Sequence, residues 1–150
     1  MEYSSQSSQT SQNESSSSAG SVPASLLIID DEVAFLEALA DSCREQGYGV
    51  STATTVDQGL DVALAAKPSV ILLDVTLPGD SGWRALETLG THPSTRGIPV
   101  IMMSGREMSR PSPCRVTPAA WLDKPFAPTD LFHVVDRVLG SSGRAVSHSQ

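Results

Sequence analysis

Leu26–Glu32 reads LLIIDDE, and Val70–Asp74 reads VILLD. Each stretch is a continuous run of four large apolar residues that stops at an aspartate. An unbroken apolar run of this length is typical of a strand that is buried on both faces. The two stretches therefore predict central strands of a sheet that is covered on both sides.

Strand-like and helix-like segments alternate along the chain around these two stretches. The predicted strands are Leu26–Ile29, Val50–Ala53, Val70–Leu73, Pro99–Met103 and Ala119–Leu122. The predicted helices are Val33–Glu45, a segment capped by Thr55 that runs through Lys67, a short segment from Gly82, and Pro128–Leu139. Alternating helices and apolar strands are typical of an α/β domain with a parallel sheet.

Composition divides the chain into one domain and two tails. Residues 1–21 contain ten serines and almost no apolar side chains, so burial cannot offset the entropy of ordering them. We therefore expect a disordered tail at Met1–Ala24, a domain at Ser25–Gly140, and a second disordered tail at Ser141–Gln150 that follows a helix-stopping Gly140. A domain of this size has room for one hydrophobic core.

Charge and cysteine content narrow the class of protein. The chain carries a formal charge of −7, and Ser25–Leu139 alone holds 15 acidic and nine basic residues. This excess of negative charge disfavours direct nucleic-acid binding. The apolar runs are far shorter than the about 20 residues that cross a bilayer, so no membrane insertion is expected. Cys43 and Cys114 are too few for a disulfide scaffold and indicate reduced thiols of a cytoplasmic protein.

Polar residues follow the predicted strands at the end where a parallel sheet forms its binding sites. They are Asp30, Asp31 and Glu32 after the first strand, Asp74 after the third, Ser104 after the fourth and Lys124 after the fifth. Taken singly, each has an ordinary explanation, because Asp30 or Asp31 could cap the next helix. Taken together, they predict a cation: two like charges about 4 Å apart repel by about 4 kcal/mol at an effective dielectric near 20. All-oxygen donors suit Mg²⁺.

Lysine, hydroxyl and carboxylates beside a metal are typical of a site for a phosphoryl group. Ile71–Gly82 reads ILLDVTLPGDSG, Val100–Gly105 reads VIMMSG and Trp121–Phe126 reads WLDKPF. With LLIIDDE, these motifs resemble the receiver domain of bacterial two-component response regulators, over residues 25–140 and in the family's order. The resemblance implies a flavodoxin-like, doubly wound sheet of five parallel strands in the order 2-1-3-4-5, with helices on both faces.

The resemblance also implies roles for the residues at the strand ends. Asp74 corresponds to the phosphoacceptor, which attacks the phosphorus of a phosphohistidine. Lys124 would pair with Asp74 before the reaction and with the phosphate afterwards. The peptide bond between Lys124 and Pro125 resembles the family's cis peptide bond. Ser104 would bind a phosphoryl oxygen through its hydroxyl.

The implied metal site holds Mg²⁺. Asp31, Asp74 and the backbone carbonyl of Thr76 would be its ligands, and Asp30 would assist through water. The cation would neutralise charge that builds on the phosphoryl oxygens.

Several positions flank the site or depart from the family pattern. Trp121 stands where receivers carry a switch aromatic, but it is bulkier than usual and could be a plain packing residue. Thr76, Gly105 and Arg106 flank the phosphoryl site, and Arg106 could clamp phosphate or simply be exposed. The proline-rich segment Gly105–Pro118 leaves little room for the family's fourth helix, which we expect to be short or irregular.

The expected function is that of a single-domain response regulator, because no output domain fits after Leu139. It would take phosphate from a histidine kinase or histidine phosphotransfer protein, and would signal by binding an unknown downstream protein. It would not be an enzyme beyond catalysing its own phosphorylation and dephosphorylation. The alternative is a receiver-fold docking module that works without phosphorylation. A phosphatase of the haloacid-dehalogenase type is disfavoured because Asp-x-Asp is missing, and nucleotide binding because the glycine motifs are missing.

Overall fold

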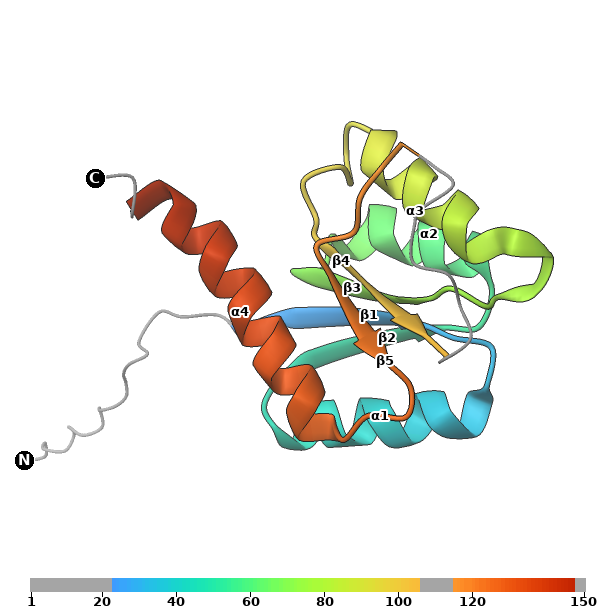
Figure 1. The fold of residues 1–150 in the computed structure, drawn as a ribbon, viewed down its shortest axis with the longest axis horizontal. Helices are drawn as coiled ribbons and strands as arrows, with labels where there is room; N and C mark the ends of the chain where they lie inside the picture. Colours follow the sequence, from blue (N-terminus) through green and yellow to red (C-terminus); the bar gives the residue numbers. More distant parts are fainter. Residues whose placement is uncertain (1–22, 106–114, 148–150) are drawn as a thin grey trace, which may run out of the picture.

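Five parallel strands form the middle layer of the structure in the order β2-β1-β3-β4-β5, and helices cover both faces (Figure 1). The computed structural model describes residues 23–105 and 115–147. The strands are β1 (Ser25–Ile29), β2 (Gly49–Ala53), β3 (Val70–Asp74), β4 (Val100–Ser104) and β5 (Ala120–Asp123). The helices are α1 (Val33–Glu45), α2 (Val56–Ala66), the short 3-10 turn η3 (Pro78–Asp80), α3 (Ser81–Thr91) and α4 (Pro128–Ser147). The predicted fold and strand order are confirmed.

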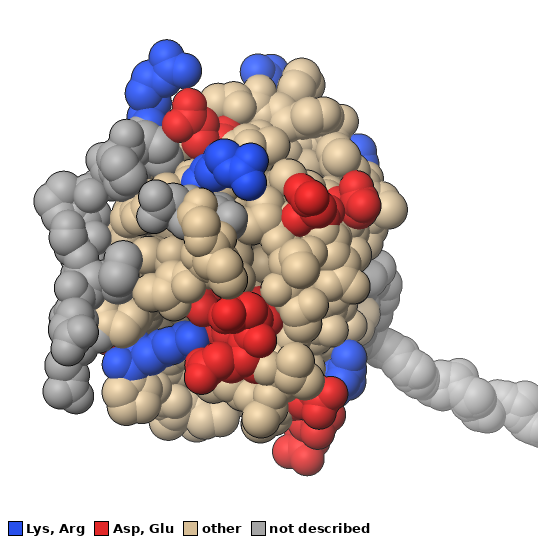
Figure 2. All heavy atoms as spheres, turned by 90° about the vertical axis from the view of Figure 1, so that its right-hand side faces the viewer, with Lys and Arg blue, Asp and Glu red and all other residues tan. Residues whose placement is uncertain are grey.

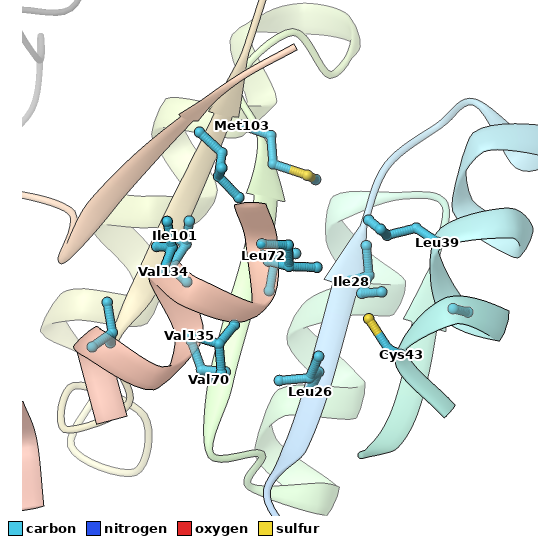
Figure 3. Close-up of a cluster of buried hydrophobic side chains, with 14 of the residues drawn as sticks. Leu26, Ile28, Leu39, Cys43, Val70, Leu72, Ile101, Met103, Val134 and Val135 are labelled. Carbon is cyan, nitrogen blue, oxygen red and sulfur yellow. The ribbon is translucent and has the colours of Figure 1, made fainter. Parts of the chain in front are cut away.

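The apolar runs occupy the centre of the sheet because both of their faces are buried. Alternate residues of a strand point to opposite faces, so each run contributes to two separate cores. One core lies between the sheet and helices α1 and α4, on what we call the α1/α4 face (Figure 3). Its strand residues are Leu26, Ile28, Val70, Leu72, Ile101, Met103 and Leu122. The other lies on the α2/α3 face, and its central-strand residues are Leu27, Ile29, Ile71, Leu73, Val100 and Met102.

The strand register brings the carboxyl ends of the strands to one edge of the sheet. Ile29 of β1 pairs with Leu73 of β3, Asp74 pairs with Met103 of β4, and Ser104 pairs with Asp123 of β5. The residues that follow these pairs therefore share one end of the molecule, as the sequence predicts.

Local signals explain where the second helix begins and ends. The Thr55 hydroxyl accepts a hydrogen bond of 3.1 Å from the backbone N–H of Gln58, which confirms Thr55 as the cap of α2. Lys67 adopts a left-handed conformation at φ 47° after the last helical residue, and Pro68 follows. Helix α1 differs, because its cap position is Glu32 and no side chain caps it. Neither Asp30 nor Asp31 is the cap that the sequence allowed.

The end of the last helix was predicted wrongly. Helix α4 runs through Gly140 to Ser147 and does not stop at Gly140. A glycine inside a helix costs about 1 kcal/mol relative to alanine, which lowers helix stability without forbidding the helix. The domain limits themselves, 25–140 with tails at 1–24 and 141–150, stay a prediction, and most of both tails' side chains lie outside the described part of the chain.

The helix expected between the fourth and fifth strands falls on residues 106–114, which are outside the described residues. Gly105 and residues 115–119, which flank this segment, contain no helix. Among the helices that the structure describes, none combines the length and the apolar character needed to cross a bilayer.

Candidate functional site

Three aspartates converge at the carboxyl end of the sheet. Carboxylate oxygens of Asp30, Asp31 and Asp74 lie within 4.8 Å of one another. Asp30 and Asp74 are buried, whereas Asp31 is exposed. Figure 2 looks onto this side of the molecule and shows acidic side chains gathered near its middle.

Strand alternation explains why three of the site residues meet. Asp30 continues the series Leu26 and Ile28, and Asp74 continues Val70 and Leu72, so both carboxylates emerge from the α1/α4 face. Lys124 follows Leu122 of β5 in the same phase. All three side chains thus reach the sheet edge on one face, where their charges meet.

Lys124 is the cation of this cluster. Its Nζ donates a hydrogen bond of 2.8 Å to Asp30 Oδ2 and lies 3.6 Å from Asp74 Oδ2. Glu32 Oε1 lies 3.7 Å from the same nitrogen, although most of the Glu32 side chain is exposed. The predicted pairing of Lys124 with Asp74 is confirmed as an ion pair, but the closer partner is Asp30. The cis peptide bond expected between Lys124 and Pro125 is also present.

Burial and charge shift two pKa values in the cluster. Burial raises the pKa of Asp30 above its usual range, and the neighbouring Asp74 charge adds to this, although Lys124 and the backbone N–H of Glu32 oppose it. For Lys124, burial acts to lower the pKa, but the hydrogen bond to Asp30 and the charge of Asp74 outweigh burial. The pKa of Lys124 is therefore raised, and the ammonium stays charged at neutral pH.

The Asp74 carboxylate is held by its own loop. Asp74 Oδ1 accepts two hydrogen bonds from Thr76, one of 3.0 Å from the backbone N–H and one of 2.9 Å from the hydroxyl. Gly82, near the start of α3, packs directly against this backbone. A Cβ at Gly82 would lie 2.5 Å from the carbonyl oxygen of Asp74 and 2.6 Å from that of Val75, so no larger residue fits without moving the loop.

Asp30 also shapes the turn into α1. Its Oδ1 accepts a hydrogen bond of 2.9 Å from the backbone N–H of Glu32. Its two oxygens are thus divided between a backbone donor and the Lys124 ammonium. This division leaves the exposed Asp31 and the second oxygen of Asp74 as the more available donors of the cluster.

Ser104 and Trp121 lie on the opposite face. Ser104 follows Val100 and Met102 in strand phase, which places its side chain on the α2/α3 face at the same end of the sheet. The hydroxyl is buried and has no hydrogen-bond partner among the described residues. Trp121 of β5 pairs with Met102 of the neighbouring strand β4. The ring centroid of Trp121 lies 5.7 Å from that of Trp83 on α3. The sequence did not predict this pair of tryptophans.

Gly105 and Arg106 follow the fourth strand in the sequence. Gly105 is half-buried just after β4, whereas Arg106 lies outside the described residues. Sequence reasoning missed Phe35, whose ring centroid lies 4.4 Å from Lys124 Nζ. Its position in the first turn of α1 gives no sequence signal for this contact, because helix phase does not say which neighbour a ring covers.

The donor set fits a divalent cation. The three carboxylates supply only oxygen ligands, and the net charge of Asp30, Asp31, Asp74 and Lys124 is negative. Mg²⁺ prefers oxygen donors and is bound by one or two carboxylates together with water. Asp31 and Asp74 meet this requirement, because Asp30 is already engaged by Lys124 and Glu32.

Comparisons with known proteins agree with this geometry. Residues 26–136 match the family model of the response regulator receiver domain. The phosphate regulon transcriptional regulatory protein PhoB of Pseudomonas aeruginosa is 33% identical over 120 residues, which are 79% of this chain and 52% of PhoB. The chain thus spans about half the length of that relative. Protein Rrf1 of Nitratidesulfovibrio vulgaris is 28% identical over 123 residues, 80% of this chain and 86% of Rrf1.

Solved structures give the same result. The CheY-like response regulator receiver domain protein of Methanospirillum hungatei superimposes with a TM-score of 0.75 at 25% identity, over 83% of this chain and 99% of that one. The fold, the cluster of three aspartates and Lys124 at the carboxyl end of the sheet, and the family model are mutually consistent. The chain belongs to the response regulator receiver domain family.

Proposed function

We propose that this receiver domain accepts a phosphoryl group on Asp74 from a phosphohistidine and signals through a phosphorylation-dependent contact with another protein. One observation carries the proposal: buried Asp74 lies among the carboxylates of Asp30 and Asp31, with the Lys124 ammonium 3.6 Å from its Oδ2. Acidic residues beside a lysine at the carboxyl ends of parallel strands are suited to binding and transferring phosphate.

The proposed step is an in-line displacement. A carboxylate oxygen of Asp74 attacks phosphorus, a P–O bond forms, and the P–N bond to the donor imidazole breaks. The imidazole nitrogen keeps the electron pair and takes a proton from solvent. Thr76 orients the nucleophile, since its N–H and hydroxyl both bind Asp74 Oδ1.

Lys124 and Ser104 complete the proposed site from two faces of the sheet. Lys124 offsets the charge of Asp74 before the reaction and of a phosphoryl oxygen after it. Ser104 is proposed to donate its unpartnered hydroxyl to another phosphoryl oxygen. Movement of Ser104 toward the phosphate would displace its strand end, and Trp121 on the same face is the proposed switch residue.

Mg²⁺ is the proposed cofactor. Asp31, Asp74 and the backbone carbonyl of Thr76 would hold it, with Asp30 assisting through water. When bound, it would neutralise negative charge on the phosphoryl oxygens. Gly105 and Arg106 are proposed to border the phosphate.

The proposed donor is a histidine kinase or a histidine phosphotransfer protein, and the receiver of the signal is a further protein. Dephosphorylation by water at Asp74 would end the signal, so the only catalysis proposed acts on the protein itself. The cytoplasmic location stays a prediction. Single-domain status and the lack of nucleic-acid contact also stay predictions, because PhoB, a transcriptional regulatory protein, is about twice as long as the matched region.

The test is phosphate uptake measured by intact mass. The wild type is incubated with acetyl phosphate and Mg²⁺ beside Asp74→Asn and a matched acidic control, Asp57→Asn, in the exposed first turn of α2. We expect one phosphoryl group on the wild type and on Asp57→Asn, and none on Asp74→Asn, which should unfold as cooperatively as the wild type. No uptake by the wild type, beside an active receiver as control, would favour the docking module that needs no phosphate.

A further inference from the structure

The Lys124 ammonium is drawn toward three carboxylates at once. Nζ is hydrogen-bonded to Asp30 at 2.8 Å, and Asp74 and Glu32 lie 3.6 and 3.7 Å away. A lysine side chain has four flexible carbon–carbon bonds, so these competing attractions do not by themselves fix where the charge sits. The arrangement raises the question of what holds the ammonium between Asp30 and Asp74.

An aromatic ring lies against the same nitrogen. Lys124 Nζ sits over the ring of Phe35, 4.4 Å from its centroid. The face of an aromatic ring carries partial negative charge and attracts a cation within about 6 Å. Because Phe35 is in the first turn of α1, the ring offers the ammonium a neutral neighbour that cannot compete for its protons.

A second ring fixes the orientation of the first. Phe126 packs edge-on against Phe35, with centroids 5.9 Å apart and planes at 86°. Phe126 lies two residues after Lys124, so the segment that carries the lysine also carries the ring that orients Phe35. Both rings pack against the core of the α1/α4 face. The lysine and its aromatic support are thus built as one unit.

We propose that Phe35 is a positioning residue for phosphoryl transfer. The Phe35 ring holds the Lys124 ammonium within reach of Asp74 while Lys124 exchanges its carboxylate partners for phosphate. The inference rests on the proposed function. Phe35 contacts no reacting atom; it limits the positions open to the cation, so less of the binding energy of the phosphoryl group is spent on ordering the lysine.

The test compares rates of phosphorylation by phosphoramidate with saturating Mg²⁺. We expect Phe35→Leu to slow uptake about threefold to tenfold, the range expected for losing a partly desolvated cation–π contact. Phe35→Tyr and Phe35→Trp keep an aromatic face and should restore the rate to within about twofold. The matched control is Phe132→Leu, which removes a ring from the same core, where Phe132 packs against Tyr48 with ring centroids 5.9 Å apart.

A cycle with Lys124→Gln separates positioning from general loosening. Phe35→Leu should cause no further slowing in the Lys124→Gln background, because the ammonium that the ring acts on is gone. Equal slowing in both backgrounds, slowing by Phe132→Leu as large as by Phe35→Leu, or failure of Phe35→Tyr to restore the rate would each overturn the inference. If Phe35→Leu does not fold, Phe35→Met takes its place.

The outcomes also distinguish failure of the positioning role of Phe35 from failure of the proposed phosphoacceptor function. A wild type that takes up phosphate at the same rate as Phe35→Leu contradicts the positioning role alone. A wild type that takes up no phosphate contradicts the proposed function, and the role of Phe35 in it falls at the same time.

Discussion

The two faces of the sheet differ in how their polar groups are satisfied. On the α1/α4 face, the Lys124 ammonium is paired with the buried carboxylates of Asp30 and Asp74. On the α2/α3 face, the buried Ser104 hydroxyl has no partner within residues 23–105 and 115–147, and Trp121 packs against Trp83. Paired charges are thus concentrated on one face, and the hydroxyl that is proposed to take a new partner is on the other.

The same division holds for titration. The groups with shifted pKa values, Asp30, Cys43, Tyr48 and Lys124, all lie on the α1/α4 side. We therefore expect the free energy of unfolding to depend on pH through the α1/α4 face, and the proposed switch to depend on the α2/α3 face.

Removal of the buried cation should cause the largest loss. Lys124→Gln leaves Asp30 and Asp74 buried without a cation, and breaking a buried pair in this way costs about 3 kcal/mol. Urea unfolding at neutral pH measures the change. The chain has one other lysine, Lys67, which is exposed, so Lys67→Gln is the matched control and should change stability by less than about 0.5 kcal/mol. A similar small loss for Lys124→Gln would contradict the ionic cluster.

The Cys43 thiol should make the α1/α4 core sensitive to alkali. Burial raises the pKa of Cys43 from 9.0 to about 11. The folded state therefore keeps the thiol proton over a range where the unfolded chain loses it, so stability should fall as pH rises from 9 to 11. A shift of about two pKa units corresponds to about 3 kcal/mol at most.

Cys43→Ala isolates this effect. The variant loses some packing at every pH, but its stability should fall less steeply than that of the wild type between pH 9 and 11. Lys124 also contributes, since its raised pKa means that its stabilisation is present below about pH 10.5 and is lost as pH rises further. That contribution is common to both proteins and cancels in the comparison. Parallel stability curves would show that the thiol does not titrate as described.

Mg²⁺ should raise the free energy of unfolding by a smaller amount, through the carboxylates of the α1/α4 face. Binding to the folded state alone adds about 1.4 kcal/mol when the free ion is tenfold above its dissociation constant. Thermal unfolding with chelator and with millimolar Mg²⁺ measures this gain. Asp31→Asn removes one exposed carboxylate of the cluster and should reduce the gain, whereas Asp57→Asn on α2 should leave it intact. An equal gain in all three proteins would place the ion elsewhere.

The contrast between the faces also marks the limit of sequence reasoning. The apolar runs and the acidic residues that follow them predict the sheet and its strand order. They also predict that Asp30, Asp74 and Lys124 meet, because strand register and the alternation of side chains determine which residues share a face. Side-chain partners were harder. The hydrogen bond of Lys124 to Asp30 and the ring of Phe35 beside it depend on rotamers, which no residue pattern encodes.

Helix ends and glycine contacts were harder for a different reason. Gly140 resembles a helix stop, yet packing of Val134, Val135 and Val138 holds α4 in place and the helix continues past it. Gly82 is visible in the sequence, but its contact with the carbonyl oxygen of Asp74 arises from the approach of α3 to the loop after β3. Tertiary approach of this kind cannot be deduced from local sequence.

The smallest effect on stability should come from substitution of Ser104. This substitution tests most directly whether the two faces of the sheet have different roles. Its buried hydroxyl makes no hydrogen bond in the described part of the chain, so Ser104→Ala removes an unsatisfied polar group and should change stability by less than about 0.5 kcal/mol, or increase it slightly. Phosphate-dependent changes should nevertheless be lost, because the hydroxyl is proposed to find its partner only on the phosphoryl group. Trp fluorescence from the Trp83–Trp121 pair provides the measurement: acetyl phosphate should change it in the wild type and much less in Ser104→Ala. A variant that is clearly destabilised, yet keeps the full fluorescence response, would show that the hydroxyl serves the resting fold and not the switch.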